Sequence, residues 1–268
     1  MEVGNNLKAM SIIKPTNHTA PVFYPTSNYL IAKYMDLTKF SSLLSMKSLF
    51  FCRLDKLEDH FEGTTSKPNF ERRKRLYQTL HLRSPKIKKL SESEVNQNVK
   101  EHYEADEKLK ALNCVCCWNK YESESAALWK IYSDFHKGIM IKSDINSLIS
   151  AFENTEEELS LSEINYIDFN KDYMPDGNTM YPIIHKHKAY TFEEELRLIY
   201  TVKFEHGLTY DWSKEKIEHG KYIKLDLNEL IKEIVVSPYA ANWYIDLIQD
   251  ISKKFGLDKE IKRSGLAK

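Results

Sequence analysis

Hydrophobic and polar residues alternate most regularly in the stretch from residue 185 to 203, HKHKAYTFEEELRLIYTVK. In an extended chain, Glu193, Glu195 and Arg197 fall on one face. The opposite face is apolar and consists of Leu196, Leu198, Tyr200 and Val202. A helix over the first half would instead pair Glu193 with Arg197, worth about 0.2–0.5 kcal/mol. The β-rich continuation LRLIYTV favours a strand that presents three charges on one face.

The same reasoning predicts the other elements. Strands are expected at 29–35, 48–53, 112–119, 139–143, 164–169, 221–227, 233–238 and 259–263. Helices are expected after Asp36 and Asp144, which are capping residues, and at 125–132 and 240–255. Hairpin-like neighbours and crossovers both occur along the chain. The pattern therefore predicts an α+β fold, a mainly antiparallel twisted sheet with flanking helices.

The domain organisation follows from two segments outside this pattern. Residues 1–27 contain Pro15, Pro21 and Pro25 and are expected to form an irregular N-terminal arm. Residues 28–268 then form one domain. Two hydrophilic helices, interrupted near Ser84 and Pro85, form a charged helical hairpin inserted at about 68–111.

Composition limits the function classes. The 268 residues include 39 basic and 39 acidic side chains, so no global field favours nucleic acid or an anionic membrane. The N-terminal sequence has no signal-peptide pattern, and no apolar run reaches the length of a membrane helix. A cytoplasmic protein without membrane contact is therefore expected. Cys52, Cys114, Cys116 and Cys117 lack the paired spacing of a structural zinc site and are expected to be reduced thiols.

A local basic patch lies at 72–89, within the inserted hairpin. Its cations are Arg72, Arg73, Lys74, Arg75, Arg83, Lys86, Lys88 and Lys89. The ordinary interpretation is a solvated helical surface. The alternative is contact with a nucleic-acid backbone or an acidic partner.

An ordered set of short motifs carries a family resemblance. Lys33-Tyr34, LEDHFEG at 57–63, LWKIYSDFHKGIMI at 128–141 and INY at 164–166 are followed by Lys188, by Glu193-x-Glu195-x-Arg197, by EIVVSPYA at 233–240 and by KRSGL. Together they resemble the bacterial domain of unknown function 2971 family over about residues 29–266. Two departures are residues 58–62, EDHFE, where the family usually has an Asn-Asp-Pro-Phe-Glu turn, and Tyr190, where a Trp is common. The resemblance implies a fold and a cluster of positions, and it implies no reaction.

The charged triplet also resembles, with low specificity, the Glu-x-Glu element of ADP-ribosyltransferases. That resemblance implies that Glu193 or Glu195 stabilises an oxocarbenium-like centre as nicotinamide leaves NAD, and that Arg197 anchors the strand or a phosphate. NAD would then be a substrate, with no other cofactor indicated. The ligand-binding residues expected around it are Lys33, Tyr34, Asp59, Phe61, Glu62, Trp129, Tyr132 and Lys188. The corresponding role is a toxin or phage-defence effector acting on a nucleotide.

Three alternatives stay open. The triplet is alternatively a charge ladder on an ordinary sheet. Asp59, His60, Glu62, His185 and His187 could hold a divalent metal in a nuclease, although loop histidines without a metal are the ordinary interpretation. The third alternative is a non-enzymatic sensor that binds a ligand or a partner.

The sequence contains no G-x-G-x-x-G, P-loop or nucleophile elbow, which argues against a conventional dinucleotide fold, an NTPase or an α/β hydrolase. Whether the chain is an enzyme, and its oligomeric state, are not determined by the sequence.

Overall fold

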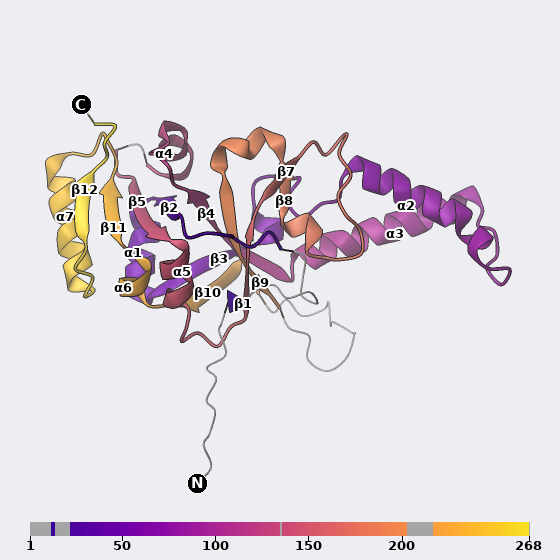
Figure 1. Ribbon diagram of the computed structural model, residues 1–268, viewed down its shortest axis with the longest axis horizontal. Helices are drawn as coiled ribbons and strands as arrows, with labels where there is room; N and C mark the ends of the chain where they lie inside the picture. The colour runs from indigo at the N-terminus through magenta and orange to yellow at the C-terminus, as the bar shows by residue number, and fades with distance from the viewer. Residues whose placement is uncertain (1–11, 14–21, 135, 203–216, 268) are drawn as a thin grey trace, which may run out of the picture.

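The computed structural model describes residues 12–13, 22–134, 136–202 and 217–267 (Figure 1). These residues form an α+β domain around a ten-stranded, mostly antiparallel sheet, as the sequence predicts. The central path of the sheet runs β1-β6-β9-β4-β2-β5-β11-β12, with β3 and β10 beside it, and β7 and β8 form a separate parallel pair. The β1–β6 and β11–β12 pairs are the parallel ones in the large sheet.

The strands have the following bounds. They are β1 (Ile12–Ile13), β2 (Leu30–Met35), β3 (Ser48–Arg53), β4 (Asn113–Lys120), β5 (Ile139–Asp144), β6 (Leu159–Glu163), β7 (Asn165–Ile167), β8 (His185–His187), β9 (Glu195–Thr201), β10 (Gly220–Lys224), β11 (Glu233–Val236) and β12 (Glu260–Arg263). The α-helices are α1 (Leu37–Met46), α2 (Lys67–Thr79), α3 (Glu92–Lys110), α4 (Ala126–Tyr132), α5 (Ile145–Ala151), α6 (Leu227–Leu230) and α7 (Asn242–Lys254). Short 3₁₀ helices are η1 (Leu54–Lys56), η2 (Leu80–Arg83), η3 (Tyr181–Ile183) and η4 (Lys188–Glu193).

Local capping signals set several of these helix starts. The Asp36 carboxylate accepts the Lys39 backbone N–H at 2.7 Å at the start of α1. Asp144 caps α5 in the same way through Ser147. Because the first turn of a helix leaves backbone N–H groups without helical partners, a side-chain acceptor at that position stabilises it. The predicted starts at Asp36 and Asp144 are confirmed.

Strand β4 lies at a fork in the sheet. Along one edge it pairs with β9 from Asn113 to Asn119. Along the other edge its first half pairs with β3, through Cys114 and Val115, and its end pairs with β2, through Asn119 and Lys120. Strands β2 and β3 therefore separate beside the middle of β4, and α1 connects them. This split positions the cavity described below.

The largest hydrophobic core lies on the face of the sheet that α1 and α5 cover. It contains the apolar face of β9, as the alternating pattern predicts: Leu196, Leu198, Tyr200 and the following Val202 are buried in it. Because β-strand side chains alternate, the intervening Glu195 and Arg197 point to the opposite face. There they are covered by β8, η3 and the loop that carries Glu62.

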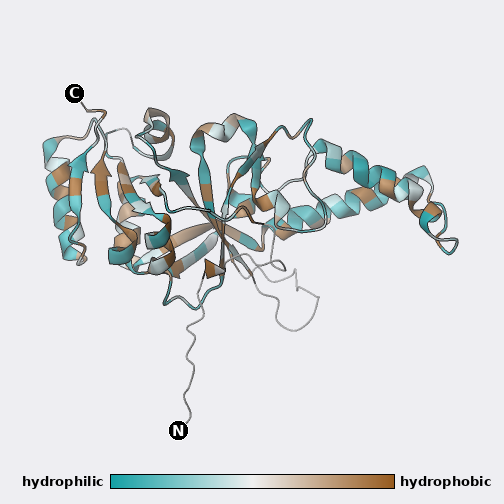
Figure 2. Cartoon of the chain, viewed as in Figure 1, coloured by the Kyte–Doolittle hydropathy of each residue, from teal (hydrophilic) through white to brown (hydrophobic). Residues whose placement is uncertain are grey.

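The inserted segment is a helical hairpin, as predicted. Helices α2 and α3 pack against each other and project from the body of the molecule (Figure 1), and their surface is largely hydrophilic (Figure 2). Its base is held by Asn69, whose side chain exchanges two hydrogen bonds with the Met174 backbone at 2.6 and 2.9 Å. The arm is therefore anchored at its base and projects at the other end.

Two predictions in the central region were wrong in detail. Strand β9 begins at Glu195, because Glu194 has a left-handed backbone (φ 41°) that interrupts the extended chain, and Glu193 ends η4. The predicted strand at 164–169 is shorter in the structure, where it is β7. Strand β6 at 159–163 was missed because the acidic run before it masked its alternation.

Within the predicted N-terminal arm, Ile12–Ile13 pair with β6 and Phe23 bridges to Glu163. The predictions for residues 1–11 and 14–21, and for residue 203 at the end of the central stretch, lie outside the described residues.

No helix in the described part of the chain has both the length and the apolar character needed to cross a membrane.

Candidate functional site

Arg197 is the centre of a buried group of charges, and its side chain has no solvent exposure. Its Nε donates to Glu195 Oε1 at 2.7 Å, and its two terminal nitrogens donate to Glu62 at 3.0 and 3.2 Å. Nη1 also donates to the Ile183 carbonyl at 2.6 Å. A planar guanidinium can bind two carboxylates at once in this way, which a lysine cannot. The two carboxylates keep the pKa of Arg197 well above its usual value.

Lys186 is the second buried cation. Its Nζ lies 2.6 Å from Glu193 Oε2, 3.0 Å from Glu195 Oε2 and 3.4 Å from Glu62 Oε1. We call Glu62, Lys186, Glu193, Glu195 and Arg197 the charged cluster. It holds three carboxylates and two cations, and each of the five side chains is at least nine-tenths buried. Burial of charge is tolerated here because every member is paired.

Glu193 is the carboxylate that connects the charged cluster to the next layer. Its Oε1 accepts a 2.6 Å hydrogen bond from the Tyr132 hydroxyl, which comes from the end of α4. Burial and this hydrogen bond to an anion both raise the pKa of Tyr132, so the phenol is the donor. Glu193 therefore has one oxygen toward Lys186 and the other toward Tyr132.

The pKa values of Glu193 and Glu195 are shifted in opposite directions. Burial raises the pKa of Glu193 above its usual value. Glu195 is also penalised by burial, but Arg197 and Lys186 together lower its pKa to about 2. Carboxyl groups whose environments separate their pKa values in this way are typical of acid–base sites, although structural ion-pair networks show the same behaviour. Glu195 is thus the fixed anion, and Glu193 is the carboxyl that protonates more readily.

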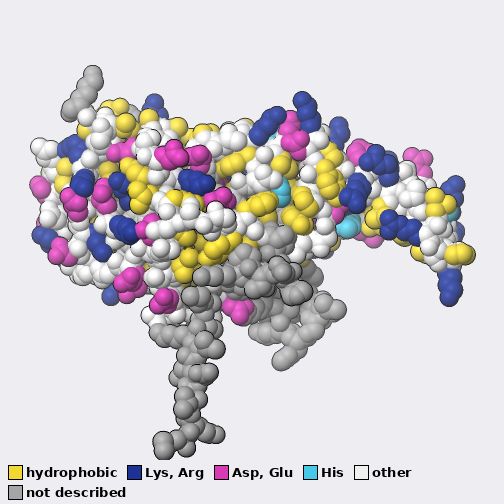
Figure 3. All heavy atoms as spheres, in the orientation of Figure 1, with side chains coloured by type: hydrophobic (Ala, Val, Ile, Leu, Met, Phe, Trp, Pro, Cys, Tyr) yellow, Lys and Arg dark blue, Asp and Glu magenta, His cyan; other side chains and the backbone are white. Residues whose placement is uncertain are grey.

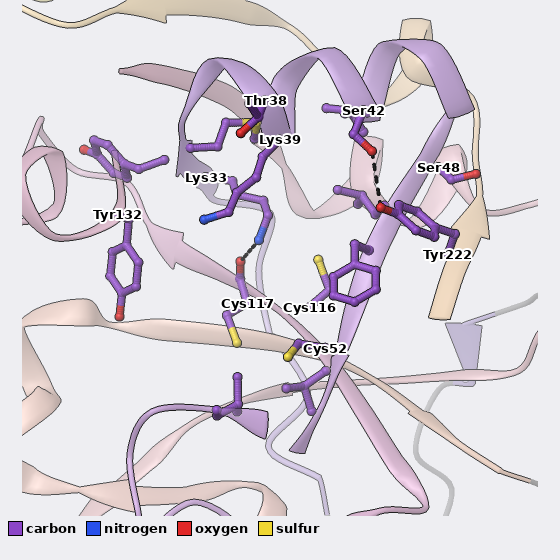
Figure 4. A pocket seen from close by; sticks show the side chains of 17 residues that line it. Lys33, Thr38, Lys39, Ser42, Ser48, Cys52, Cys116, Cys117, Tyr132 and Tyr222 are labelled. Atoms are coloured by element: carbon purple, nitrogen blue, oxygen red, sulfur yellow. Dashed lines mark hydrogen bonds between the residues drawn. The ribbon is translucent and has the colours of Figure 1, made fainter. Parts of the chain in front are cut away.

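A cavity of about 440 Å³ lies at the fork of the sheet (Figure 4). Cys116 and Cys117 of β4 line its floor, β2 and α1 contribute Lys33, Thr38 and Lys39, and β3 and β10 contribute Phe50 and Tyr222. Tyr132 lines it as well, so one side chain belongs to both the cavity and the contacts of Glu193. Phe50, Tyr222 and Tyr132 are each more than a third exposed, which leaves the cavity open at these residues.

The split between β2 and β3 explains the position of Lys33. Beside the middle of β4 no neighbouring strand pairs with Cys117 on that edge. The Lys33 Nζ takes the place of a strand and donates to the Cys117 carbonyl at 2.7 Å (Figure 4). An unpaired buried carbonyl would otherwise cost free energy. The ammonium is thereby held at the cavity surface, with Lys39 on the neighbouring helix (Figure 4).

The other predicted ligand-binding residues lie outside the cavity, in different places. Trp129 is buried under the edge of the Tyr34 ring, with centroids 5.0 Å apart, and so contributes to a small core. Phe61 is partly exposed and lies 5.2 Å from the His187 ring. Lys188 pairs with Asp168 at 2.8 Å on the surface. Of the predicted set, only Lys33, Tyr34 and Tyr132 line the cavity.

The loop before Glu62 forms a defined turn that contains no proline. The Asp59 carboxylate accepts the Phe61 backbone N–H at 2.9 Å, and its carbonyl accepts the Glu62 N–H at 3.0 Å. A short aspartate side chain can replace a backbone turn in this manner. Gly63, with φ +69°, then turns the chain away after Glu62.

The residues of the metal-nuclease alternative do not assemble. The described residues contain no group of three or more His, Cys, Asp or Glu that could hold a metal. Glu62 is bonded to Arg197 and Lys186, and the buried His185 ring shares a 2.7 Å hydrogen bond with the Tyr181 carbonyl. The structure therefore gives this alternative no support within those residues.

Sequence reasoning missed several residues of the site: Lys39, Phe50, Cys117, Lys186 and Tyr222. Lys186 precedes Glu193 by only seven residues, but no local pattern marks it as the partner of three carboxylates. Burial raises the pKa of the Cys117 thiol well above its usual value, so Cys117 is not an activated nucleophile. The four missed residues that line the cavity come from four separate elements, so no local motif connects them.

Comparison with known proteins identifies distant structural similarity and no family. No family model matches the chain, so its resemblance to the domain of unknown function 2971 family stays a prediction. No curated protein matches it. Two structures of DarT from Thermus sp. 2.9, in complex with NAD⁺ and with carba-NAD⁺, are similar at a TM-score of 0.38 and 10% identity. The matches cover 90% of this chain and 96% and 97% of the DarT chains. At this level the likeness assigns neither a family nor a function.

Proposed function

We propose that the cavity binds a nucleotide and that the chain is an ADP-ribosyltransferase-like enzyme acting on NAD⁺. The observation that carries the proposal is the position of Tyr132, which lines the cavity and hydrogen-bonds Glu193 of the charged cluster. A ligand in the cavity is thereby adjacent to a carboxylate that the fold holds in place.

The cavity supplies the two chemical features that a nucleotide requires. Lys33 and Lys39 offer ammonium groups to phosphate oxygens, and both lie on the same side of the cavity (Figure 4). Phe50 and Tyr222, whose ring centroids are 5.0 Å apart across β3 and β10, offer apolar faces to a base. The volume of about 440 Å³ lies within the usual range of small-molecule sites.

The proposed reaction breaks the bond between nicotinamide and ribose. Nicotinamide leaves with the bonding electron pair, and the ribose carbon becomes an oxocarbenium-like cation that a carboxylate stabilises. An oxygen or nitrogen nucleophile of the acceptor, or water, then bonds to the same carbon and releases its proton to solvent. Glu193 is the carboxylate in reach of the cavity, once Tyr132 turns its hydroxyl aside. Glu195, Lys186 and Arg197 then act as positioning residues, since they hold Glu193 or one another and do not line the cavity.

Two measurements test the proposal together. Binding is measured by calorimetry with NAD⁺, ADP-ribose and the unphosphorylated nicotinamide riboside, and turnover by chromatographic detection of free nicotinamide. We expect NAD⁺ and ADP-ribose to bind and nicotinamide riboside to bind at least tenfold more weakly. Lys33→Met should weaken NAD⁺ binding at least tenfold, whereas Lys224→Met, an exposed lysine of β10 that does not line the cavity, should not.

The Glu193→Gln variant separates binding from chemistry. It should bind NAD⁺ with nearly unchanged affinity and release at least 100-fold less nicotinamide. Nicotinamide release at the wild-type rate by this variant would exclude Glu193 as the reactive carboxylate, and absence of NAD⁺ binding to the unmodified chain would exclude the proposed function.

A ligand-binding protein without catalysis is the second candidate. It is favoured by the pairing of every carboxylate in the charged cluster, since Glu193 and Glu195 are both bonded to Lys186. In that case NAD⁺ or ADP-ribose binds to the unmodified chain and no nicotinamide appears.

A further inference from the structure

The projecting hairpin concentrates positive charge on its first half, which consists of α2, η2 and the tip. Residues 67–90, from the start of α2 to the tip, contain nine Lys and Arg side chains and one Glu. Residues 91–110, essentially α3, contain six acidic and three basic side chains. The whole chain is neutral, so the cationic side of the arm is a local feature that the rest of the molecule offsets. Figure 3 shows Lys and Arg side chains along the arm as far as its end.

Part of this charge is used to hold the arm together. Arg73 forms an ion pair with Asp106 of α3 at 2.5 Å, and the Arg72 guanidinium lies over the Tyr173 ring, 5.0 Å from its centroid. Lys88 lies 3.7 Å from Glu94, whose carboxylate completes the capping box at the start of α3. These three cations have structural partners.

The other cations of residues 67–90 form no ion pair with a described residue. Within the described part of the chain, no ion pair involves the side chains of Lys67, Lys74, Arg75, Arg83, Lys86 or Lys89. Arg75, Arg83, Lys86 and Lys89 are exposed. Unpaired cations on a rigid support repel one another, and a polyanion relieves that repulsion.

The shape of the surface favours nucleic acid over the other polyanionic partners. The exposed cations without ion pairs begin at Arg75 in α2 and continue through Arg83 of η2 to Lys86 and Lys89 at the tip, so they extend along the outer part of the arm. A phosphate backbone likewise presents charges along its length. A protein interface normally requires apolar or aromatic residues at its centre, and a membrane contact requires several. In residues 67–110 the exposed large hydrophobic side chains are Phe70 in α2, Leu82 in η2 and Tyr103 in α3, one from each element of the arm.

We infer that the arm is a nucleic-acid-binding surface, with Arg75, Arg83, Lys86 and Lys89 contacting backbone phosphates. The base of the arm is fixed by Asn69 and Met174, so the surface is presented in a constant orientation. The contacts are to phosphates and are therefore independent of base sequence. This inference does not require the cavity to bind NAD⁺, and each proposal can fail without the other.

The test measures binding of the full chain to a fluorescent 20-nucleotide single-stranded DNA, to RNA of the same length and to poly-glutamate, at several salt concentrations. Each phosphate contact contributes about 0.7 to the slope of log affinity against log salt for a single strand. Four contacts therefore predict a slope of about −2.8, which is about a 50-fold loss of affinity between 50 and 200 mM salt.

A charge-matched pair of variants assigns the binding to the arm. The test variant changes Arg75, Arg83, Lys86 and Lys89 to Gln. The control changes four other exposed lysines to Gln, namely Lys130, Lys171, Lys253 and Lys254. We expect the test variant to lose at least tenfold in affinity and most of the salt slope, and the control to lose less than threefold.

Three results would overturn the inference. The first is no binding to DNA or RNA at 50 mM salt. The second is an equal loss in both variants, which would indicate a net-charge effect. The third is tighter binding of poly-glutamate than of either nucleic acid, which would indicate an acidic protein partner. Circular dichroism and thermal melts of both variants check that the fold is unchanged.

Discussion

The Tyr132 hydroxyl donates a 2.6 Å hydrogen bond to Glu193, although the two residues are 61 positions apart in the sequence. Tyr132 comes from the last turn of α4, and Glu193 from the end of η4. This one contact joins the cavity to the charged cluster. Lys186 holds the second oxygen of Glu193, so the carboxylate is fixed from both sides.

Removal of the Tyr132 hydroxyl should destabilise the protein. In Tyr132→Phe the Glu193 Oε1 loses its donor, and a buried acceptor without a partner costs about 1–3 kcal/mol in the free energy of unfolding. The control is Tyr222→Phe, whose hydroxyl contacts Ser42 at 3.4 Å on the surface and should change stability by less than about 0.5 kcal/mol. Urea denaturation at pH 7 measures both. Equal losses of unfolding free energy in the two variants would show that the Tyr132–Glu193 hydrogen bond stabilises the protein no more than a surface hydroxyl contact.

Removal of Arg197 should be among the most damaging single changes. Arg197→Met leaves Glu62 and Glu195 buried with only Lys186 as a cation, and breaking a buried ion pair costs about 3–5 kcal/mol. Lys100→Met removes the exposed 3.8 Å pair with Glu104 and should cost about 0–1 kcal/mol. Urea denaturation compares the two. A loss below 1 kcal/mol for Arg197→Met would show that the charged cluster relaxes or admits water.

Acid should destabilise the protein partly through Glu195. Its pKa is 4.5 in an ordinary environment and about 2 in the folded protein, so folding favours the ionised form. The resulting stability is present above pH 4.5 and is lost as the pH falls toward 2, in an amount on the order of 3 kcal/mol. Glu195→Gln should lack this part of the acid-side loss. Unfolding free energies of the wild-type protein and of Glu195→Gln at pH 7, 4 and 3 measure this loss. The same dependence of unfolding free energy on pH in both proteins would contradict the lowered pKa of Glu195.

Glu193 should show the opposite sign. Its pKa is raised by burial, so its contribution to stability is present below pH 4.5 and is lost as the pH rises through the folded-state pKa. A neutral side chain is therefore tolerated better at position 193 than at position 195. At pH 7 we expect Glu193→Gln to cost at least about 1 kcal/mol less in unfolding free energy than Glu195→Gln. The reverse order would assign the raised pKa to the wrong carboxyl.

Gly63 should tolerate a side chain less well than Gly256, a glycine with a similar backbone angle. Its φ is +69°, and a Cβ there would lie 2.6 Å from Leu54 Cδ2 and 3.1 Å from Lys110 Cγ. Gly256 has a similar φ of +77° but open space around it. Gly256→Ala should therefore cost only the backbone strain, about 1 kcal/mol, and Gly63→Ala about 1–3 kcal/mol more. Thermal and urea denaturation give the difference. Equal costs would show that Leu54 moves freely.

Two features of the site show the limit of local patterns. The alternation at 195–202 predicts the orientation of Glu195 and Arg197, because side-chain direction in a strand depends only on position parity. The strand was nevertheless extended two residues too far, because the left-handed backbone at Glu194 is set by the surrounding contacts. Lys186 was missed for the same reason, since its three carboxylate partners come from a loop, a 3₁₀ helix and another strand.

The sequence by itself determined the elements that local chemistry specifies: the helix starts at Asp36 and Asp144, the hairpin at 68–111 and the apolar face of β9. These depend on capping side chains and on periodicity, both of which act within a few residues. Only the tertiary structure decided that β2 and β3 separate beside Cys117, that a cavity lies at this fork and that Tyr132 meets Glu193 there. Those features depend on the order of strands in the sheet, which brings together residues that no local signal connects.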